Sequence, residues 1–519
     1  RNPFAQLPRK LAFALASRPG RTMRTERAGV VGRVLRLRAE LAHNLDVDPA
    51  TIRAKIHFVE HHKAHLASAM FVSGFDRAAV CSIDGFGDLV SGMWGVGEGA
   101  RIKVHGRVRF PHSLGVFYEA LTQYLGFAKW GDEYKVMGLS SYGEPDYLDE
   151  MRRIVANDDE LGYRLDLECF RHHLEGSSMT WDGGSPVSRV LYSPELERRL
   201  GPARRGPDEE ITDRHRAVAA SLQRRLEEVV LELLRRLQAR AGLDRLCLAG
   251  GVALNCVVNG RIRTDTPFRE LFIQPAAGDG GTSIGAAFHV WHQVLGRPRS
   301  EVMEHAYLGP EFSETEAKEA LTAAGVVWKA VPGPELSDLV AGMLAEGRIV
   351  GWFQGRMEFG PRALGNRSIL ADPRRPEMKD VLNARVKHRE PFRPFAPSVL
   401  EHRTGEWFDQ SYPSPFMLLT YGVLPHRRHL IPAPTHVDGT GRLQTVRRDQ
   451  NPRFFDLLMA FERRTGVPVV LNTSFNDNEP ICCAPAEAVD CFRRTHMDVL
   501  VIGNLVAEKR WNPPDTPVP

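Results

Sequence analysis

The stretch from His61 to Asp88 constrains the fold more than any other part of the chain. It begins with the letters HHKAH, continues through an apolar run and ends in SIDGFGD. The apolar run over residues 78–83 predicts a short buried strand, and the glycines after it allow a close approach of the backbone to a phosphate. A buried strand that follows a helix and ends in a glycine turn is typical of α/β proteins.

The same stretch contains residues suited to metal binding. His61 and His65 are four residues apart, so on a helix both imidazoles project from one face, and Asp84 at the end of a neighbouring strand can complete a facial set of ligands. We therefore expect a site that holds a metal ion and a nucleotide together. The alternative is that the histidines are ordinary helix residues and that Asp84 belongs to a simple turn. The spacing of the two histidines alone favours this alternative, so the choice between the two depends on residues further along the chain.

Length and composition bound the class of protein. The 519 residues predict two domains, or three, and the net charge of +4 argues against a dedicated nucleic-acid binder. Arginine outnumbers lysine, which suits recognition of anionic small molecules. The seven cysteines form no C-x-x-C pair, so a reducing cytoplasm is expected. No apolar run reaches the roughly 18 residues of a membrane span.

Two segments near the start of the chain have helical patterns. Residues 9–17 are basic and then apolar, like a signal peptide, but the apolar part is short, and a surface helix is predicted. Residues 21–41 predict an Arg-rich helix whose leucines and valines pack on the protein. Nucleic-acid binding by this helix is the less favoured alternative.

Further along, periodic and non-periodic segments alternate. A helix is predicted from Ser113 to about Gly126, and a buried helix over residues 214–241. The charged residues 150–215 are poorly periodic and predict an insertion or a substrate-facing segment. Between them, residues 131–139 mix charge with glycine, and form either a solvated loop or a wall of the ligand cleft; their charged members are Asp132, Glu133 and Lys135.

A double-glycine turn marks a candidate anion site. A strand is predicted over residues 245–249, followed by Gly250, Gly251 and a helix that holds Asn255. A strand, a glycine turn and a helix N-terminus bind anions because free backbone N–H groups point outward there.

The same order of elements recurs once more. A strand is predicted over residues 271–273, then the letters GDGG at 278–281, then an apolar helix over 283–295. This order places Asp279 at the end of a strand beside a glycine turn, as Asp84 is. Two histidines, two aspartates and several glycine turns therefore belong to one predicted cleft.

These segments resemble the actin-like ATPase (ASKHA) superfamily, and specifically the branch with the TsaD-type protein of tRNA threonylcarbamoylation and the O-carbamoyltransferases of nodulation-factor (NodU-type) and antibiotic biosynthesis. The resemblance implies a TsaD-like α/β domain over residues 1–300 that holds an iron-like metal against nucleotide phosphates. No counterpart of the family's first phosphate loop precedes His57, so the first strands of this domain are expected to be missing. The matching metal ligands are His61, His65, Asp84 and Asp279, and the matching nucleotide-binding residues are Gly250, Gly251, Asn255 and Lys135.

Beyond a linker predicted at residues 297–309 the sequence changes character. Residues 355–368 contain three arginines in a loop fixed by glycines and a proline, and residues 387–395 add a lysine and two arginines. This charge favours a polyphosphate and acyl-phosphate cleft over a solvated basic surface. A buried strand over 469–471 is followed by the letters NTSFN, short polar groups that can bond a ligand.

This part resembles the YrdC-like α/β domain that is fused to the metal domain in the O-carbamoyltransferases, and it is expected to span residues 301–519. The resemblance implies that it binds carbamoyl phosphate and the adenylate through seven residues. They are Arg356, Arg362, Lys387, Arg393, Arg442, Asn472 and Ser474.

The implied activity is an ATP-dependent O-carbamoyl transfer. Carbamoyl phosphate and ATP, with Mg²⁺, yield carbamoyl adenylate, and the carbamoyl group then passes at a site with Fe²⁺ or another divalent metal to a hydroxyl of a sugar or antibiotic-type natural product. His61, Arg362 and Lys387 are the residues expected to act in catalysis. The expected partner is a hydroxylated small molecule, without nucleic acid or a membrane, and a homodimer is compatible with the sequence.

Three alternatives stay open. A threonylcarbamoyl transferase that modifies tRNA shares both domain types, but its His-x-Glu-Gly-His is HHKAH here, and the small net charge offers little for tRNA. Hydrogenase-maturation carbamoyltransferases carry C-x-x-C zinc motifs that this sequence lacks. A nucleotide-binding relative without chemistry would release no AMP in response to an acceptor.

Overall fold

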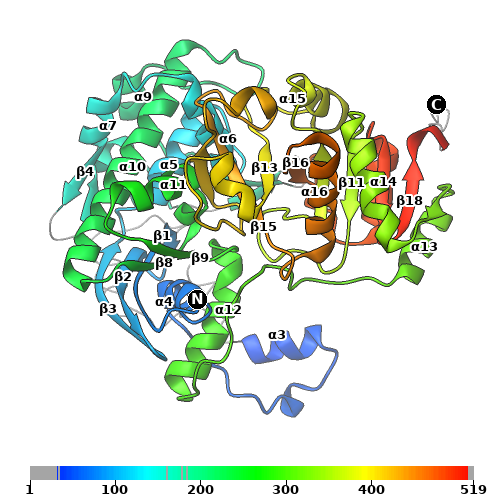
Figure 1. Ribbon diagram of the computed structural model, residues 1–519. Helices are drawn as coiled ribbons and strands as arrows, with labels where there is room; N and C mark the ends of the chain where they lie inside the picture. Colours follow the sequence, from blue (N-terminus) through cyan, green and yellow to red (C-terminus); the bar gives the residue numbers. More distant parts are fainter. Residues whose placement is uncertain (1–31, 33–35, 159–161, 177–178, 183–184, 512–519) are drawn as a thin grey trace. The chain divides into compact units, whose positions relative to one another are not determined.

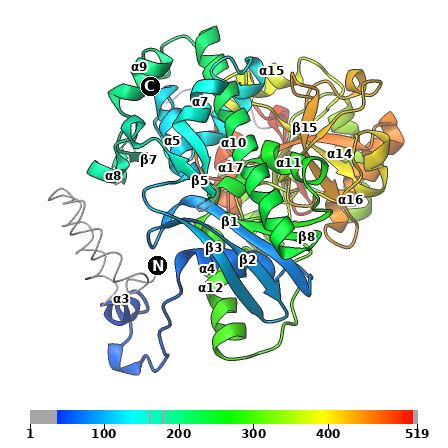
Figure 2. The same cartoon turned by 90° about the vertical axis from the view of Figure 1, so that its left-hand side faces the viewer.

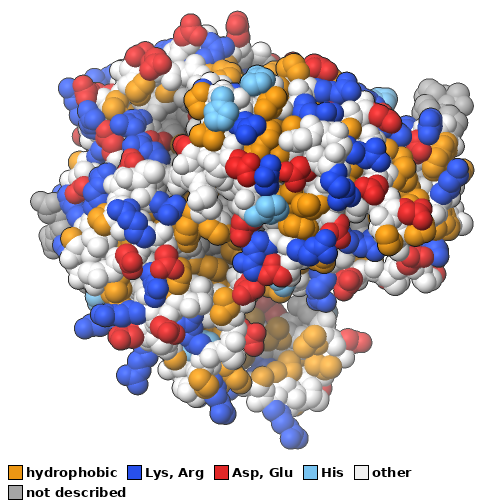
Figure 3. Space-filling view, viewed as in Figure 1, with side chains coloured by type: hydrophobic (Ala, Val, Ile, Leu, Met, Phe, Trp, Pro, Cys, Tyr) orange, Lys and Arg blue, Asp and Glu red, His pale blue; other side chains and the backbone are white. Residues whose placement is uncertain are grey.

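The computed structural model describes residues 32, 36–158, 162–176, 179–182 and 185–511. The chain divides into two compact units. Unit 1 runs up to Val258 and includes Ile262–Val302, and unit 2 consists of Asn259–Arg261 and the chain from Met303 onward. The predicted α/β class is confirmed, since each unit contains a β-sheet with helices packed on it. Figure 3 shows Lys and Arg side chains interspersed with Asp and Glu over the face in view.

Unit 1 is built on a five-stranded sheet of order β3-β2-β1-β8-β9. The first three strands of the chain pair antiparallel, while β1, β8 and β9 run parallel. Figures 1 and 2 show α4 and α12 on one side of this sheet and α5 and α10 on the other. The strands are β1 (Arg77–Gly87), β2 (Val90–Glu98), β3 (Arg101–Arg109), β8 (Arg245–Ala249) and β9 (Glu270–Ile273), and the helices are α4 (His61–Met70), α5 (Leu114–Tyr124), α10 (Asp213–Ala241), α11 (Cys256–Asp265) and α12 (Thr282–Phe288).

Most elements predicted for unit 1 are confirmed. Helix α5 begins after Ser113, whose side chain accepts a hydrogen bond from the Val116 N–H at 3.1 Å, and α10 ends at Gly242 in the left-handed conformation. The apolar helix after Asp279 is divided, because α12 continues as a π-helical segment, His289–Val294.

Two predictions for unit 1 need correction, and one open alternative is decided. Of the solvated loop and the cleft wall that the sequence allows for residues 131–139, the loop is excluded, since helix α6 (Glu133–Leu139) occupies most of them. Asp84 lies inside β1, just beyond Ser82, the last residue that pairs with β8. Asp279 begins a 3₁₀ turn, Asp279–Gly281, that follows the end of β9 only after a connecting segment.

The segment over residues 150–215 has more regular structure than its poor periodicity predicts. It contains two two-stranded sheets between short helices. The elements are α7 (Leu148–Ile154), β4 (Val155–Asp158), β5 (Gly162–Leu165), α8 (His172–Glu175), β6 (Met179–Asp182), β7 (Ser185–Ser188) and α9 (Pro194–Leu200).

The helix predicted over residues 9–17 lies outside the described residues. Only the end of the Arg-rich pattern is described, in α3 (Leu37–Asn44). Leu41 of this helix is 40% exposed, so the predicted packing by leucines is wrong at this position. No described helix is long and apolar enough to cross a membrane.

Unit 2 is built on a nine-stranded mixed sheet of order β10-β18-β17-β11-β12-β16-β13-β15-β14. A buried apolar core forms between the sheet and helices α13, α15 and α17, while α14 and α16 pack on each other and on the strands. The strands are β10 (Lys329–Ala330), β11 (Val350–Phe353), β12 (Arg367–Ala371), β13 (Ala396–Leu400), β14 (Leu419–Gly422), β15 (Thr440–Val446), β16 (Val469–Ser474), β17 (Val499–Ile502) and β18 (Leu505–Glu508), and the helices are α13 (Glu314–Ala323), α14 (Gly333–Ala345), α15 (Met378–Leu382), α16 (Pro452–Thr465) and α17 (Pro485–Arg494).

Strand β16 is longer than the predicted strand over residues 469–471. It includes Asn472 and Ser474, which were expected to follow the strand. Asn472 and Ser474 therefore project from the same face of the sheet, because side chains alternate along a strand.

Candidate functional site

Two histidines and two aspartates of unit 1 converge on one point. His61 and His65 lie one turn apart on α4, and their Nε2 atoms are 3.1 Å apart. Asp84 Oδ2 lies 3.1 Å from His61 Nε2 and 3.3 Å from His65 Nε2. Asp279 Oδ1 lies 3.4 and 3.7 Å from the same two nitrogens. The structure thus brings together all four residues expected to bind a metal.

This arrangement fits a divalent metal ion. Ligand atoms about 2.1 Å from an ion are about 3.0 to 3.4 Å from one another, which matches all of these spacings except the 3.7 Å between His65 and Asp279. Two ring nitrogens at 3.1 Å cannot both carry a proton toward each other, so the pair requires a shared proton or a cation. Two imidazoles and a carboxylate with further oxygen ligands are the donor set of non-haem iron sites.

The electrostatics of the four residues reflect their closeness. Burial acts to lower the pKa of His65, but hydrogen bonds to Asp279 and Asp84 outweigh it and raise this pKa to about 9. Burial would raise the pKa of Asp84, yet His61 and His65 hold it well below its usual range. The carboxylates of Asp84 and Asp279 therefore favour a cation, a proton included, at this point.

Backbone groups fix the orientation of the ligands. The Gly251 N–H donates to Asp84 Oδ1 at 2.9 Å, which leaves Oδ2 directed at the histidines. The Ser113 hydroxyl lies 3.0 Å from the carbonyl oxygen of Asp84 and 2.8 Å from that of Gly85. Gly87 packs directly on the His61 ring, since a Cβ on this residue would lie 2.0 Å from the ring.

The double-glycine turn does not present free amides, contrary to the expectation. The Gly250 N–H donates to the Ala277 carbonyl at 2.7 Å, and the Gly251 N–H is bound by Asp84. Gly250 has a φ of +91°, and a Cβ on it would lie 2.2 Å from the Ile83 carbonyl oxygen. The turn therefore serves the close packing of β8 against β1.

The other two residues expected to bind nucleotide make contacts within unit 1. Asn255 caps helix α11, accepting from the Val258 N–H at 3.1 Å, and its amide exchanges hydrogen bonds with Gln223. Lys135 forms an ion pair of 3.0 Å with Asp132.

In unit 2, Lys387 and the end of β16 form a buried polar cluster. Lys387 Nζ donates to the Ser474 and Asn476 carbonyls at 2.6 and 2.8 Å and lies 2.9 Å from Asn476 Oδ1. Burial, with Arg389 and Arg393 nearby, lowers the pKa of Lys387 well below its usual range.

Asn472 lies in a second part of this polar face. Its amide nitrogen donates to Ser398 Oγ at 3.0 Å, Gln444 Oε1 at 3.1 Å and the Ala363 carbonyl at 3.3 Å. Its Oδ1 is buried and has no hydrogen-bond partner among the described residues. An unpartnered buried acceptor is costly unless a ligand donates to it.

The arginines of unit 2 that were predicted to bind a ligand do not all lie at this polar face. Arg362 is partly buried in the loop whose Ala363 carbonyl accepts from Asn472, and Arg442 lies on β15 on the same face as Gln444. Arg393 and Arg356 face acidic neighbours instead. Their partners are Glu390, at 3.4 Å, and Glu311, at 3.9 Å.

Two models of one protein family match the chain. The model described as carbamoyltransferase N-terminus matches residues 33–288, and the model described as carbamoyltransferase C-terminus matches residues 341–509. The chain belongs to the carbamoyltransferase family. The family resemblance seen in the sequence is therefore confirmed, and the protein is a carbamoyltransferase. Both clusters described above lie within the matched ranges.

Relatives cover most of this carbamoyltransferase. Nodulation protein NolNO of Sinorhizobium fredii is 40% identical over 492 residues, which are 93% of this chain and 68% of that protein. Nodulation protein NolO of Bradyrhizobium diazoefficiens is 43% identical over 460 residues, 87% of this chain and 79% of that protein. An uncharacterized protein of Synechocystis is 43% identical over 484 residues, 88% of this chain and 77% of that protein.

Some residues that shape the two clusters of this carbamoyltransferase carry no sequence signal. Glu358 is buried and accepts from the N–H groups of Leu364, Asn366 and Arg367, at 2.6, 2.9 and 3.2 Å, and so folds the loop that contains Arg362. In unit 1, His62 lies 2.8 Å from Ser82 Oγ and 2.9 Å from the Val90 carbonyl. In the sequence, His62 cannot be distinguished from the other histidines of HHKAH, but in the structure it connects α4 to strands β1 and β2.

Proposed function

We propose that this carbamoyltransferase moves a carbamoyl group from carbamoyl phosphate, through carbamoyl adenylate, to a hydroxyl of a sugar or antibiotic-type natural product. The observation that carries the proposal is the convergence of His61, His65, Asp84 and Asp279 in unit 1. A carbamoyl transfer needs a site that binds phosphate oxygens and polarises a carbonyl, and a four-ligand metal site with room for further ligands is suited to both.

Unit 2 is the proposed site of adenylate formation. Water cleaves carbamoyl phosphate to carbamate and phosphate, and a carbamate oxygen then attacks the α-phosphorus of ATP, bound with Mg²⁺, and expels pyrophosphate. Arg362 and Arg442 neutralise the phosphate charge that develops, and Lys387 holds the end of β16 in position through its hydrogen bonds to Ser474 and Asn476. Asn472 Oδ1, buried and without a partner, accepts a hydrogen bond from the carbamate amino group.

Unit 1 is the proposed site of transfer. A divalent ion such as Fe²⁺, held by His61, His65, Asp84 and Asp279, would supply Lewis acidity toward the adenylate. The chain's own contribution is to hold the four ligands in position, through the Gly251 N–H on Asp84 and the packing of Gly87 on the His61 ring. The acceptor hydroxyl attacks the carbamoyl carbon and AMP leaves.

Each unit is also proposed to have a particular fold type. Unit 1 is proposed to be an actin-like, TsaD-like domain. The support is its three parallel strands β1, β8 and β9, because Asp84 lies in β1, the double glycine follows β8, and Asp279 lies beyond β9. Unit 2 is proposed to be a YrdC-like domain, supported by its mixed sheet with Lys387, Asn472 and Ser474 on one polar face.

Pyrophosphate release tests the first step. The purified chain is incubated with ATP, Mg²⁺ and carbamoyl phosphate, and Arg362→Ala is compared with Arg463→Ala, which removes a surface arginine paired with Asp338 at 2.8 Å. We expect Arg362→Ala to lower the rate at least about 100-fold, on the scale of a lost transition-state contact, and Arg463→Ala to leave it unchanged. Equal rates for the two variants would contradict the placement of this step in unit 2.

A metal-site variant tests the second step. His65→Ala is expected to keep pyrophosphate release while it loses AMP release in response to hydroxylated acceptors. Metal content, measured by elemental analysis of the purified variant, should fall together with transfer. A variant that transfers normally without metal would exclude this role, and a wild-type chain without acceptor-dependent AMP release would support a non-catalytic relative.

A further inference from the structure

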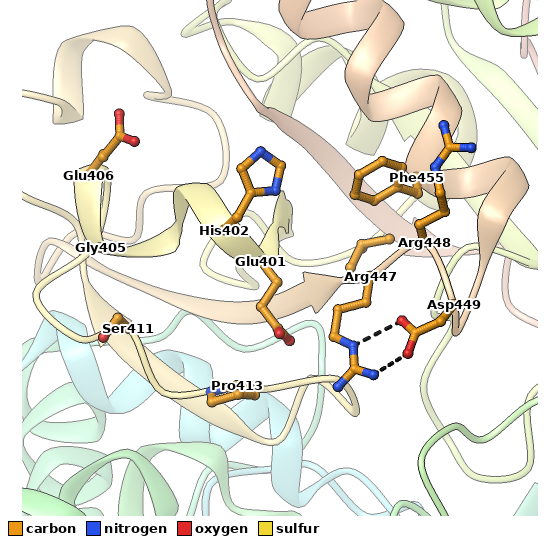
Figure 4. A pocket seen from close by; sticks show the side chains of 11 residues that line it. Glu401, His402, Gly405, Glu406, Ser411, Pro413, Arg447, Arg448, Asp449 and Phe455 are labelled. Atoms are coloured by element: carbon orange, nitrogen blue, oxygen red, sulfur yellow. Dashed lines mark hydrogen bonds and ion pairs between the residues drawn. The ribbon is translucent and has the colours of Figure 1, made fainter.

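Unit 2 contains a cavity of about 540 Å³ that the proposed reaction does not use, and Figure 4 shows the side chains around it. It opens beyond the carboxyl ends of two parallel strands, because Glu401 directly follows β13 and Arg447 directly follows β15. Ligands in α/β proteins bind beyond the carboxyl ends of parallel strands. The volume lies within the range of about 300 to 1,000 Å³ for small-molecule sites.

The cavity is separate from the polar cluster around Lys387. Asn472 pairs with Ala396 at the amino end of β13, whereas Val469 pairs with Val399 near the carboxyl end. A rise of about 3.3 Å per residue puts about 17 Å between Ser474 and Val469 along β16. The two sites therefore lie at opposite ends of the same strands.

The arginines of the cavity are already paired with carboxylates. Arg447 Nε donates to Asp449 Oδ1 at 2.9 Å, and a second bond joins the two side chains, as the dashed lines in Figure 4 show. Arg448 is paired with Asp456, and Glu406 with Arg403. With these pairs made, the described lining residues offer a phosphate no uncompensated cation.

The remaining surfaces suit a ligand with apolar faces and hydroxyl edges. Phe455 forms one wall, with its ring centroid 6.2 Å from that of His402 and 5.3 Å from the guanidinium of Arg448. Glu401 also lines the cavity, and its carboxylate accepts a hydrogen bond from the Thr445 hydroxyl at 3.1 Å. An aromatic face packs on the C–H face of a pyranose ring, while carboxylates and guanidinium groups bond its hydroxyls.

We propose that this cavity is a carbohydrate-binding site, which takes a neutral or amino-bearing mono- or disaccharide between Phe455 and the carboxylate of Glu401. The proposal rests on the cavity alone and goes beyond the transfer reaction. It predicts that the full chain binds a sugar through unit 2 without ATP or carbamoyl phosphate.

Saturation-transfer NMR on the full chain tests the proposal. The probes are methyl glucoside, cellobiose, glucosamine and N-acetylglucosamine, with AMP as an anionic comparison. We expect saturation transfer to at least one saccharide, undiminished by AMP. Absence of transfer to all four saccharides, or loss of the signal when AMP is added, would overturn the assignment.

A variant that fills the cavity tests whether the saccharide binds there. A Cβ on Gly405 would meet only the Ser411 side chain, at an ordinary 3.4 Å, so Gly405→Phe can place its ring in the cavity. Gly206→Phe is the matched control, because a Cβ there meets nothing within 4 Å. We expect Gly405→Phe to weaken saccharide binding at least tenfold, with pyrophosphate release retained, and Gly206→Phe to change neither.

A second variant covers the case in which Gly405→Phe does not fold. Phe455→Leu keeps an apolar side chain but removes the aromatic face, and should also weaken binding at least tenfold. Binding that survives in whichever of these two variants folds would place the saccharide elsewhere and overturn the proposal.

Discussion

The carboxylate of Asp88 accepts a hydrogen bond from the backbone N–H of His61 at 3.0 Å, and so caps helix α4 from 27 residues further along the chain. Glu60, directly before the helix, makes no side-chain cap. Asp88 has a φ of +55° and Leu89 one of +64°, a region that residues other than glycine rarely adopt. The turn between β1 and β2 therefore holds an unfavourable backbone conformation that directs a carboxylate at the backbone N–H of His61.

Removal of this cap should loosen the metal site. Asp88→Ala is expected to lower the free energy of unfolding by about 1 kcal/mol, the usual cost of a lost cap, and to weaken Fe²⁺ binding about tenfold. Asp88→Asn keeps an oxygen acceptor and tolerates the left-handed φ, so it should bind metal nearly as the wild type does. Anaerobic calorimetry with Fe²⁺ measures both, and unchanged affinity in Asp88→Ala would refute this positioning role.

Gly87 gives a steric test of the same site. A Cβ on Gly87 would lie 2.0 Å from the His61 ring, whereas one on Gly85 would meet nothing within 4 Å. Gly87→Ala is therefore expected to displace the ring and weaken Fe²⁺ binding at least about 100-fold, or about 2.7 kcal/mol. Gly85→Ala, two residues away on the same strand, should stay within about twofold of the wild type. Equal affinities in the two variants would show that His61 is not held by Gly87.

Local sequence signals were sufficient for many of the elements and for picking out the two histidines and two aspartates that converge in unit 1. The spacing of His61 and His65 places both on one helix face, and strand β1 follows from its apolar run, because these periodicities are properties of short segments. The helix over residues 214–241 was predictable for the same reason.

The contacts that hold the ligands were not predictable, because they join residues far apart in sequence. Nothing near Gly251 shows that its N–H binds Asp84, 167 residues earlier, instead of pointing outward to an anion. The cap of α4 by Asp88 depends on the turn between two strands. In unit 2, Glu358 accepts hydrogen bonds from three backbone N–H groups. The sequence alone does not distinguish this residue from any other charged loop residue.

The unpartnered Oδ1 of Asn472 predicts how the protein selects its acyl phosphate. Acetyl phosphate replaces the amino group of carbamoyl phosphate by a methyl group, which cannot donate a hydrogen bond to Oδ1. We expect kcat/KM for pyrophosphate release to be at least about 100-fold lower with acetyl phosphate, because a buried acceptor is then left unsatisfied.

Asn472→Ala supplies the control for this selectivity. It removes the acceptor, so the ratio between the two acyl phosphates should shrink to within about tenfold even as both rates fall. A ratio that is the same in Asn472→Ala and the wild type would mean that another group recognises the amino group.

Glu133, at the start of helix α6, predicts a pH dependence of stability. Burial, and then the neighbouring carboxylates of Glu119 and Asp132, raise the pKa of Glu133 to about 7. The folded state thus binds this proton more tightly than the unfolded state, where the pKa is about 4.3. The stabilisation is fully present below about pH 4.3 and is lost as the pH rises through 7.

Glu133→Gln tests this dependence, because glutamine keeps the shape of the protonated acid at every pH. The variant should unfold at nearly the wild-type temperature at pH 5 and at a higher temperature at pH 8, since the wild type alone must then bury a charge. Thermal unfolding midpoints at pH 5, 6, 7 and 8 measure the difference. Glu319→Gln, an exposed position on α13, should show the same small difference at each pH, and a flat profile for Glu133→Gln as well would mean that Glu133 is ionised throughout this range.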